Sequence, residues 1–63
     1  MWCFAIKKGK FEEFEKLVKK YGYRIENYFD DGWCDVFTNS EHEPTDFRNE
    51  CIQQDILDMQ KYM

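Results

Sequence analysis

Three cysteines and one histidine are the residues of this 63-residue chain that could ligate a metal or act as a nucleophile. These residues are Cys3, Cys34, His42 and Cys51. Structural zinc sites usually take two ligands from one tight turn, as in the C-x2-C pattern, and no pair here has that spacing. Cys3 and Cys34 could still meet on adjacent strands, which leaves a metal site open. The favoured interpretation is no metal and no cofactor, because free cysteine usually packs as a small hydrophobic residue.

Cys34 and His42 are also the one conceivable pair for nucleophilic catalysis. Such a pair needs the sulfur within hydrogen-bond reach of the imidazole, in a pocket with an oxyanion donor. Cys34 falls within a predicted strand and His42 in a loop beyond its end, so the spacing argues against this. His42 lies between Glu41 and Glu43, which would favour its charged form at the surface. The other carboxylates are scattered, and no catalytic site is predicted: the chain is not expected to be an enzyme.

The elements that must position these residues follow from hydrophobic periodicity. Alternation predicts a first strand over residues 2–7, and helical spacing with Gly22 behind it predicts a helix over residues 11–21. A turn at Asp31 and Gly32 predicts a hairpin with strands over residues 23–29 and 33–38. A second helix is expected to run to Met63, with Ser40 and Thr45 competing for its N-cap. Its apolar seam would consist of Phe47, Cys51, Ile52, Ile56, Met59 and Met63.

The order β-α-β-β-α predicts a single α+β domain over residues 1–63. A right-handed crossover through the first helix leaves room for the third strand between the other two. The expected sheet order is therefore 1-3-2, with the third strand antiparallel to both neighbours, as in half of a ferredoxin-like sheet. The third strand is apolar on both faces, with Trp33 and Phe37 on one and Cys34 and Val36 on the other. Which face the second helix covers is left open.

Aromatic residues are unusually frequent, at 19% of the chain. A face carrying Trp2, Phe4, Trp33 and Phe37 could stack nucleobases, but single-strand binders set such residues in a positive groove. Here Asp35 lies between Trp33 and Phe37, and the net charge is -4. Direct binding to nucleic acid is therefore not expected. The same four residues are the candidate surface for self-association into a homodimer.

Charge is distributed unevenly along the chain, with a net +4 over residues 1–24 and -8 over residues 25–63. An acidic surface steers a protein toward basic surfaces and away from nucleic acid. The alternative is that the acid serves solubility alone. The candidate partner-binding residues are Asp30, Asp31, Asp35, Glu41, Glu43, Asp46 and Glu50.

The sequence thus predicts a non-catalytic acidic module that binds a protein with a basic surface. In size and charge the chain looks like the small acidic anti-CRISPR and DNA-mimic inhibitors of phages and mobile elements, which implies an antagonist that blocks a nucleic-acid-binding surface. The alternative function is a small homodimeric interaction protein that associates through the aromatic sheet face. No stretch is apolar enough for a membrane span and no signal peptide is recognisable, so a cytoplasmic protein is expected, in the host cell if phage-encoded.

Overall fold

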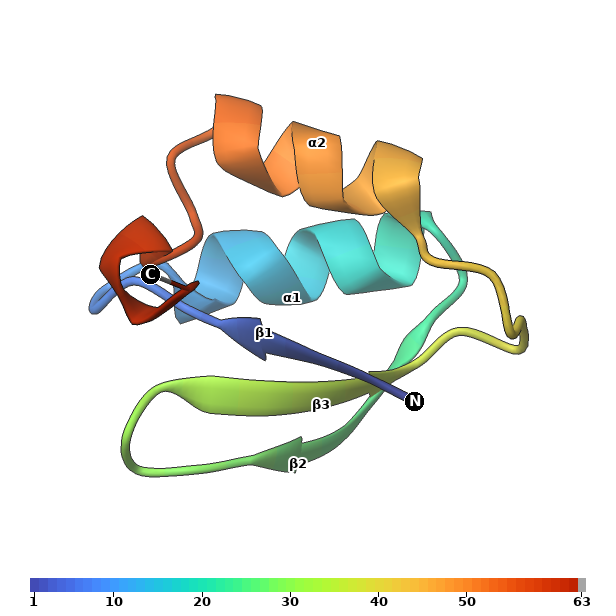
Figure 1. The fold of residues 1–63 in the computed structure, drawn as a ribbon, viewed down its shortest axis with the longest axis horizontal. Helices are drawn as coiled ribbons and strands as arrows, with labels where there is room; N and C mark the ends of the chain where they lie inside the picture. Colours follow the sequence, from blue (N-terminus) through green and yellow to red (C-terminus); the bar gives the residue numbers. More distant parts are fainter. Residues whose placement is uncertain (63) are drawn as a thin grey trace.

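The computed structural model describes residues 1–62 and contains three strands, two α-helices and a short 3₁₀ helix (Figure 1). In chain order they are β1 (Trp2–Ala5), α1 (Phe11–Lys20), β2 (Arg24–Tyr28), β3 (Trp33–Phe37), α2 (Thr45–Gln53) and η1 (Met59–Tyr62). The sheet has the order β1-β3-β2, and β3 is antiparallel to both neighbours. The predicted fold class and strand order are confirmed.

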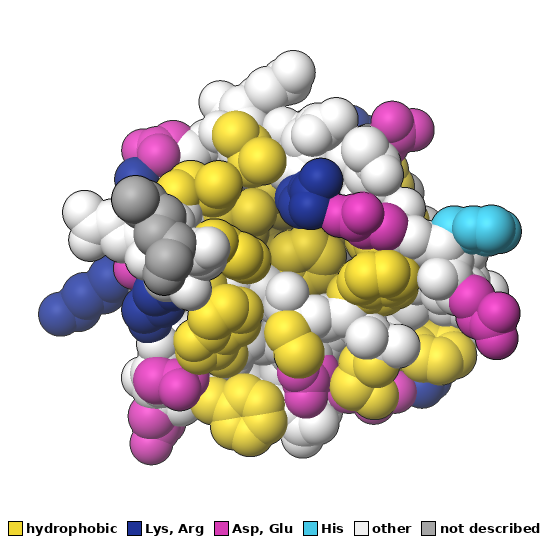
Figure 2. Space-filling model, in the orientation of Figure 1, with side chains coloured by type: hydrophobic (Ala, Val, Ile, Leu, Met, Phe, Trp, Pro, Cys, Tyr) yellow, Lys and Arg dark blue, Asp and Glu magenta, His cyan; other side chains and the backbone are white. Residues whose placement is uncertain are grey.

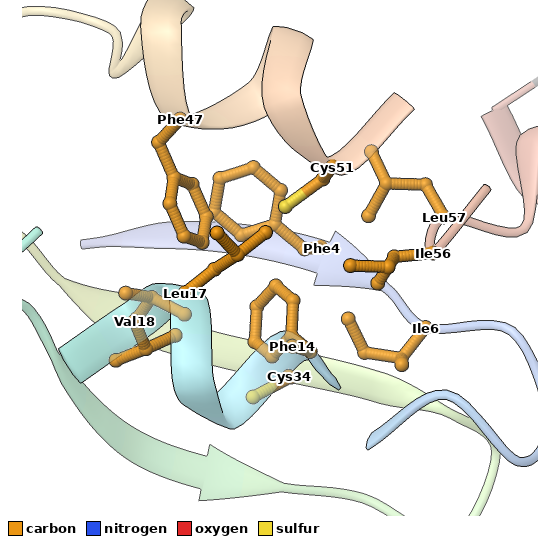
Figure 3. Close-up of a cluster of buried hydrophobic side chains, with 11 residues drawn as sticks. Phe4, Ile6, Phe14, Leu17, Val18, Cys34, Phe47, Cys51, Ile56 and Leu57 are labelled. Carbon is orange, nitrogen blue, oxygen red and sulfur yellow. The ribbon is translucent and has the colours of Figure 1, made fainter. Parts of the chain in front are cut away.

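Both α-helices lie on the same side of the sheet, which answers the question that the sequence left open (Figure 1). Phe14 of α1 and Phe47 of α2 contact the ring of Phe4 in β1, with ring centroids 5.9 and 5.3 Å apart. Figure 3 shows these rings in one buried cluster with Leu17 and Ile56. The opposite face of the sheet carries no α-helix among residues 1–62, and at one end of it the ring of Tyr62 in η1 packs against Trp33, with ring centroids 5.4 Å apart.

The first helix forms as its sequence predicts. Phe14, Leu17 and Val18 face the sheet and are nearly fully buried. Gly22 ends the helix with a φ of +74°, a conformation that glycine adopts without strain. Its N–H donates to the carbonyl of Lys19, and the N–H of Tyr23 donates to that of Val18, at 3.0 and 2.9 Å. These two bonds form a Schellman motif, which satisfies the last carbonyl groups and turns the chain into β2.

The predicted hairpin between β2 and β3 is also present. The N–H of Phe29 donates to the carbonyl of Trp33, and the N–H of Gly32 donates back to the carbonyl of Phe29, at 2.8 and 3.0 Å. Gly32 has a φ of +95°, so the loop is a tight turn completed by a glycine in the left-handed region. In β2 the register shifts between Ile25 and Asn27, a bulge that bends this edge strand.

The prediction of one long helix to the end of the chain is wrong. Helix α2 starts at Thr45 and ends at Gln53; its N-cap residue is Pro44, so neither Ser40 nor Thr45 is the N-cap. Asp55 then reverses the chain with a φ of +59°. The physical reason is that β1 leaves outward-facing backbone groups that need partners. The carbonyl of Ile56 accepts the N–H of Lys7 at 2.7 Å, and the N–H of Asp58 donates to the carbonyl of Ala5 at 2.9 Å.

This connection also buries both Ile56 and Leu57, which are 0% and 3% exposed. In the seam expected of a continuous helix, Met59 would have been buried as well, but it is 48% exposed at the start of η1. The first strand is likewise shorter than predicted, because Ile6 pairs with Leu57 in an isolated bridge. The expected seam position of Met63 lies outside the described residues.

Candidate functional site

The four aromatic residues predicted to share one surface lie on opposite faces of the sheet. Trp2 pairs with Val36 and Phe4 with Cys34, and Phe4, Cys34 and Val36 are buried under the helices. Trp33 and Phe37 alternate with these positions along β3, so they point to the uncovered face. The prediction of one platform is corrected on this point, because the register between β1 and β3 places Trp2 and Phe4 toward the core.

The uncovered face is centred on Asp35 rather than on an aromatic residue. The thiol of Cys3 donates to Asp35 Oδ1 at 2.9 Å, and the Asn27 side-chain amide donates to Oδ2 at 3.3 Å. The hydrogen bond to Asp35, with burial, raises the pKa of Cys3. Asp35 is therefore engaged within the sheet. Beside it the guanidinium of Arg24 lies 5.0 Å from the ring centroid of Phe37, so this face carries both charge signs.

The cysteines and the histidine do not come together. Cys34 and Cys51 are buried on the helix-covered side, where burial raises their pKa values to about 11 and about 12, so both thiols are protonated at neutral pH. Cys3 points to the other face, and His42 is exposed in the loop between β3 and α2. Within the described part of the chain, no three Cys, His, Asp or Glu side chains are grouped so as to hold a metal ion.

The seven predicted partner-binding residues fall into separate groups. Asp35 lies on the uncovered face, as described above. Asp30 and Asp31 form the hairpin tip, at the start of β3. Glu41, Glu43 and Asp46 follow the other end of the same strand, roughly 13 Å away at about 3.3 Å per residue. Hence the acidic residues do not converge on one surface.

The hairpin tip has mixed charge. The ammonium group of Lys61 donates to the backbone carbonyl of Asp31, and the Asp31 carboxylate accepts the N–H of Trp33 at 3.1 Å. A shallow cleft of about 360 Å³ at this end is lined by Lys8 and Lys61 as well as by Asp30, Asp31 and Asp58. A basic partner would therefore meet both attraction and repulsion here.

The loop between β3 and α2, with the first two residues of α2, is the more uniformly acidic end, and we call residues 39–46 the acidic loop. Figure 2 shows the histidine at one end of the molecule with acidic side chains beside it. Glu43 pairs with Arg48, whereas Glu41 and Asp46 are exposed and take part in no salt bridge among residues 1–62. A cleft of about 340 Å³ beside this loop is lined by Tyr21, Tyr23, His42, Glu43, Pro44 and Asp46.

Glu50, one turn beyond Asp46, has a structural role. Its carboxylate accepts hydrogen bonds from Lys20 at 3.0 Å and from the Tyr21 hydroxyl at 2.8 Å, which tie α2 to α1. The bond from Lys20, followed by that from Tyr21, lowers the pKa of Glu50. The same contact raises the pKa of Tyr21 to about 12. Glu50 is thus neutralised within the molecule and belongs to a different group from the acidic loop.

Sequence reasoning missed the two tyrosines of this cleft. Tyr21 is the last residue of the first predicted helix and Tyr23 the first residue of a predicted strand, and both lie half-buried beside the acidic loop. The available signal was Gly22 between them, because a Schellman turn folds the residues that flank it back toward each other. Their ring centroids are 5.6 Å apart.

No family model, curated protein or solved structure matches this chain. The helices found in residues 1–62 are too short and too polar to cross a bilayer.

Proposed function

We propose that this chain is a non-catalytic, acidic protein-binding module that attaches to a basic protein surface. The observation that carries the proposal is the acidic loop, where Glu41 and Asp46 remain exposed without a cationic partner among residues 1–62. Surface carboxylates that are not neutralised within the molecule attract a basic partner over a Debye length of about 8 Å at physiological salt.

The most abundant strongly basic surfaces in a cell are those that bind DNA or RNA phosphates. A small acidic body that occupies such a surface blocks it, and we propose this antagonist role, of the DNA-mimic or anti-CRISPR type, on size and charge. The partner would be a nucleic-acid-handling protein, met in the cytoplasm of a host cell. The three cysteines are free in the structure, as a reducing compartment would require.

Affinity capture from bacterial lysate tests this function. The immobilised wild-type chain should retain a basic nucleic-acid-binding protein at low salt, identified by mass spectrometry. Because a mimic and a nucleic acid compete for one surface, duplex DNA or RNA added in excess should elute that protein. A captured protein that nucleic acid does not displace would contradict the antagonist role, and capture of no basic protein would contradict the module itself.

A second candidate function, a homodimer through the uncovered sheet face, is favoured by the placement of both helices on the other side (Figure 1). Of the four residues proposed from sequence, Trp33 and Phe37 lie on this face. Three strands about 4.8 Å apart, each about five residues long at about 3.3 Å per residue, give this face a flat area of only about 240 Å².

Stable interfaces bury about 800 Å² per partner, which would be nearly a fifth of the 4507 Å² surface of this chain. A dimer formed by this face alone would therefore be weak. Light scattering at increasing concentration tests the dimer: a mass that doubles in wild type but not in a Phe37→Ser variant supports it, and a constant monomer mass contradicts it.

A further inference from the structure

The cleft beside the acidic loop combines aromatic walls with a carboxylate that has no cationic partner in the described chain. We propose that it binds an arginine side chain presented by a basic segment of the partner protein. This inference rests on the proposed function and deepens it, because it names the group that is recognised and the end of the molecule that recognises it.

The aromatic wall is held rigidly before any ligand arrives. The rings of Tyr21 and Tyr23 pack edge-to-face on Phe47, with centroid distances of 5.4 and 5.3 Å. Phe47 is fully buried, so it is a fixed support for both rings. The hydroxyl of Tyr21 is anchored to Glu50 at 2.8 Å. A ligand that contacts these rings therefore orders few side chains, which lowers the entropic cost of binding.

The charges around the cleft favour a cation. Its lining contains the carboxylates of Glu43 and Asp46 and the imidazole of His42, but no lysine or arginine. Arg48 neutralises Glu43, and Lys20 is bonded to Glu50 at 3.0 Å, so Asp46 has no salt-bridge partner among residues 1–62. The N-terminus of α2 opposes a cation with about half a positive charge, which the full charge of Asp46 in its first turn exceeds.

The structure already contains a cation against one of these rings. The ammonium group of Lys20 lies 5.8 Å from the ring centroid of Tyr21. Arginine suits the remaining surface better than lysine, because its planar guanidinium stacks on aromatic rings while its N–H groups bond a carboxylate. The apolar stem of arginine also covers aromatic surface as its charged head reaches Asp46.

An NMR titration with a short probe peptide tests the proposal. The peptide is acetyl-Gly-Arg-Gly-Arg-Gly-amide, and the control peptide carries citrulline, a neutral isostere of arginine, at both positions. We expect amide shifts in wild type to concentrate in residues 21–23 and 42–46 and to be absent with citrulline. Asp46→Asn should weaken binding about threefold to fivefold, the upper part of the range for one exposed ion pair, whereas Asp30→Asn, the matched variant at the hairpin tip, should change it little.

Tyr23→Leu keeps the bulk of the cleft wall but removes its aromatic face, and it should weaken binding while the amide spectrum stays that of a folded protein. If Asp46→Asn and Asp30→Asn weaken peptide binding equally, and amide shifts occur at both ends of β3, the proposed arginine site is wrong while the acidic module still stands. A wild-type chain that captures a basic partner from lysate but does not bind the arginine peptide would also overturn the cleft alone. A wild-type chain that neither captures a basic protein from lysate nor binds the arginine peptide would overturn both proposals.

Discussion

Phe47 and Asp46 are neighbours in the first turn of α2, yet they belong to regions with different physical roles. Phe47 is fully buried, and its ring packs against those of Phe4 in β1 and Phe14 in α1. Asp46 is exposed in the acidic loop and takes part in no salt bridge among residues 1–62. The comparison shows that the residues that stabilise this fold and those available to a partner are largely separate, so each set can be changed alone.

Leu17→Ala should have the largest effect on the buried region. Leu17 is 5% exposed between α1 and the sheet, and such truncations cost about 2 to 5 kcal/mol, a large part of the roughly 5 to 15 kcal/mol that stabilises a small domain. Urea denaturation measures the change. The matched control is Lys16→Ala, an exposed neighbour on the same helix, which should stay within about 0.5 kcal/mol of wild type. Equal denaturation midpoints for the two variants would contradict the assigned core.

Two glycines allow a packed position to be compared with an open one. Gly9 and Gly32 both have positive φ, at +84° and +95°, so alanine at either position incurs backbone strain of about 1 to 2 kcal/mol. At Gly32 an added Cβ would also lie 3.0 Å from Lys61 Nζ and 3.2 Å from the carbonyl oxygen of Ile6, whereas nothing lies within 4 Å at Gly9. Thermal unfolding should show a larger loss for Gly32→Ala. The same loss at both positions would mean that the Ile6 carbonyl and the Lys61 side chain do not approach Gly32 this closely.

A smaller effect is expected from acid at the contact between the helices. The pKa of Glu50 is lowered from its ordinary value of 4.5 by Lys20 and Tyr21, so its contribution to stability is present above pH 4.5 and is lost as the pH falls through the lowered pKa. Melting temperatures measured between pH 7 and pH 3 should therefore fall less in Glu50→Gln than in wild type. Glu41→Gln, an exposed control, should follow wild type. If the melting temperature of Glu50→Gln falls on acidification as much as that of wild type, the proposed contribution of Glu50 to the contact between α1 and α2 is wrong.

Removing metal should have no effect on stability. The thiols of Cys34 and Cys51 are protonated at neutral pH, with pKa values raised to about 11 and about 12 by burial, whereas zinc binds thiolates. The melting temperature should be the same with and without excess chelator. One zinc ion per chain by elemental analysis, lost together with the fold on chelation, would contradict this prediction.

Local signals in the sequence were sufficient for the elements that local interactions determine. The stripe from Phe14 to Val18 and the glycine that follows predicted α1, and the Asp31-Gly32 pair predicted the hairpin. The break after Gln53 was not predictable in this way, because it depends on backbone groups of Ala5 and Lys7 at the other end of the chain. Helical periodicity continued through that break and carried no sign of it.

The candidate site was less predictable than the fold for the same reason. Alternation showed that Trp2 and Phe4 share one face and that Trp33 and Phe37 share one face, but it did not show which residues of β1 lie opposite which residues of β3. The acidic residues were identified individually. Their division between the two ends of β3, and the cleft that Tyr21 and Tyr23 form beside one group, follow from tertiary packing.

The central claim, that the acidic residues bind a basic partner, is tested most directly by neutralising them together. The variant combines Asp30→Asn, Asp31→Asn, Glu41→Gln and Asp46→Asn, and the matched control removes four other charges by Glu12→Gln, Glu13→Gln, Glu15→Gln and Glu26→Gln. Association with the basic protein captured from lysate is measured for both at several salt concentrations, after their melting temperatures are checked. We predict that the first variant stays folded, associates at least about tenfold more slowly at low salt and loses most of its salt dependence, whereas the control changes much less. A folded first variant that binds the partner as fast and as tightly as wild type would contradict the account.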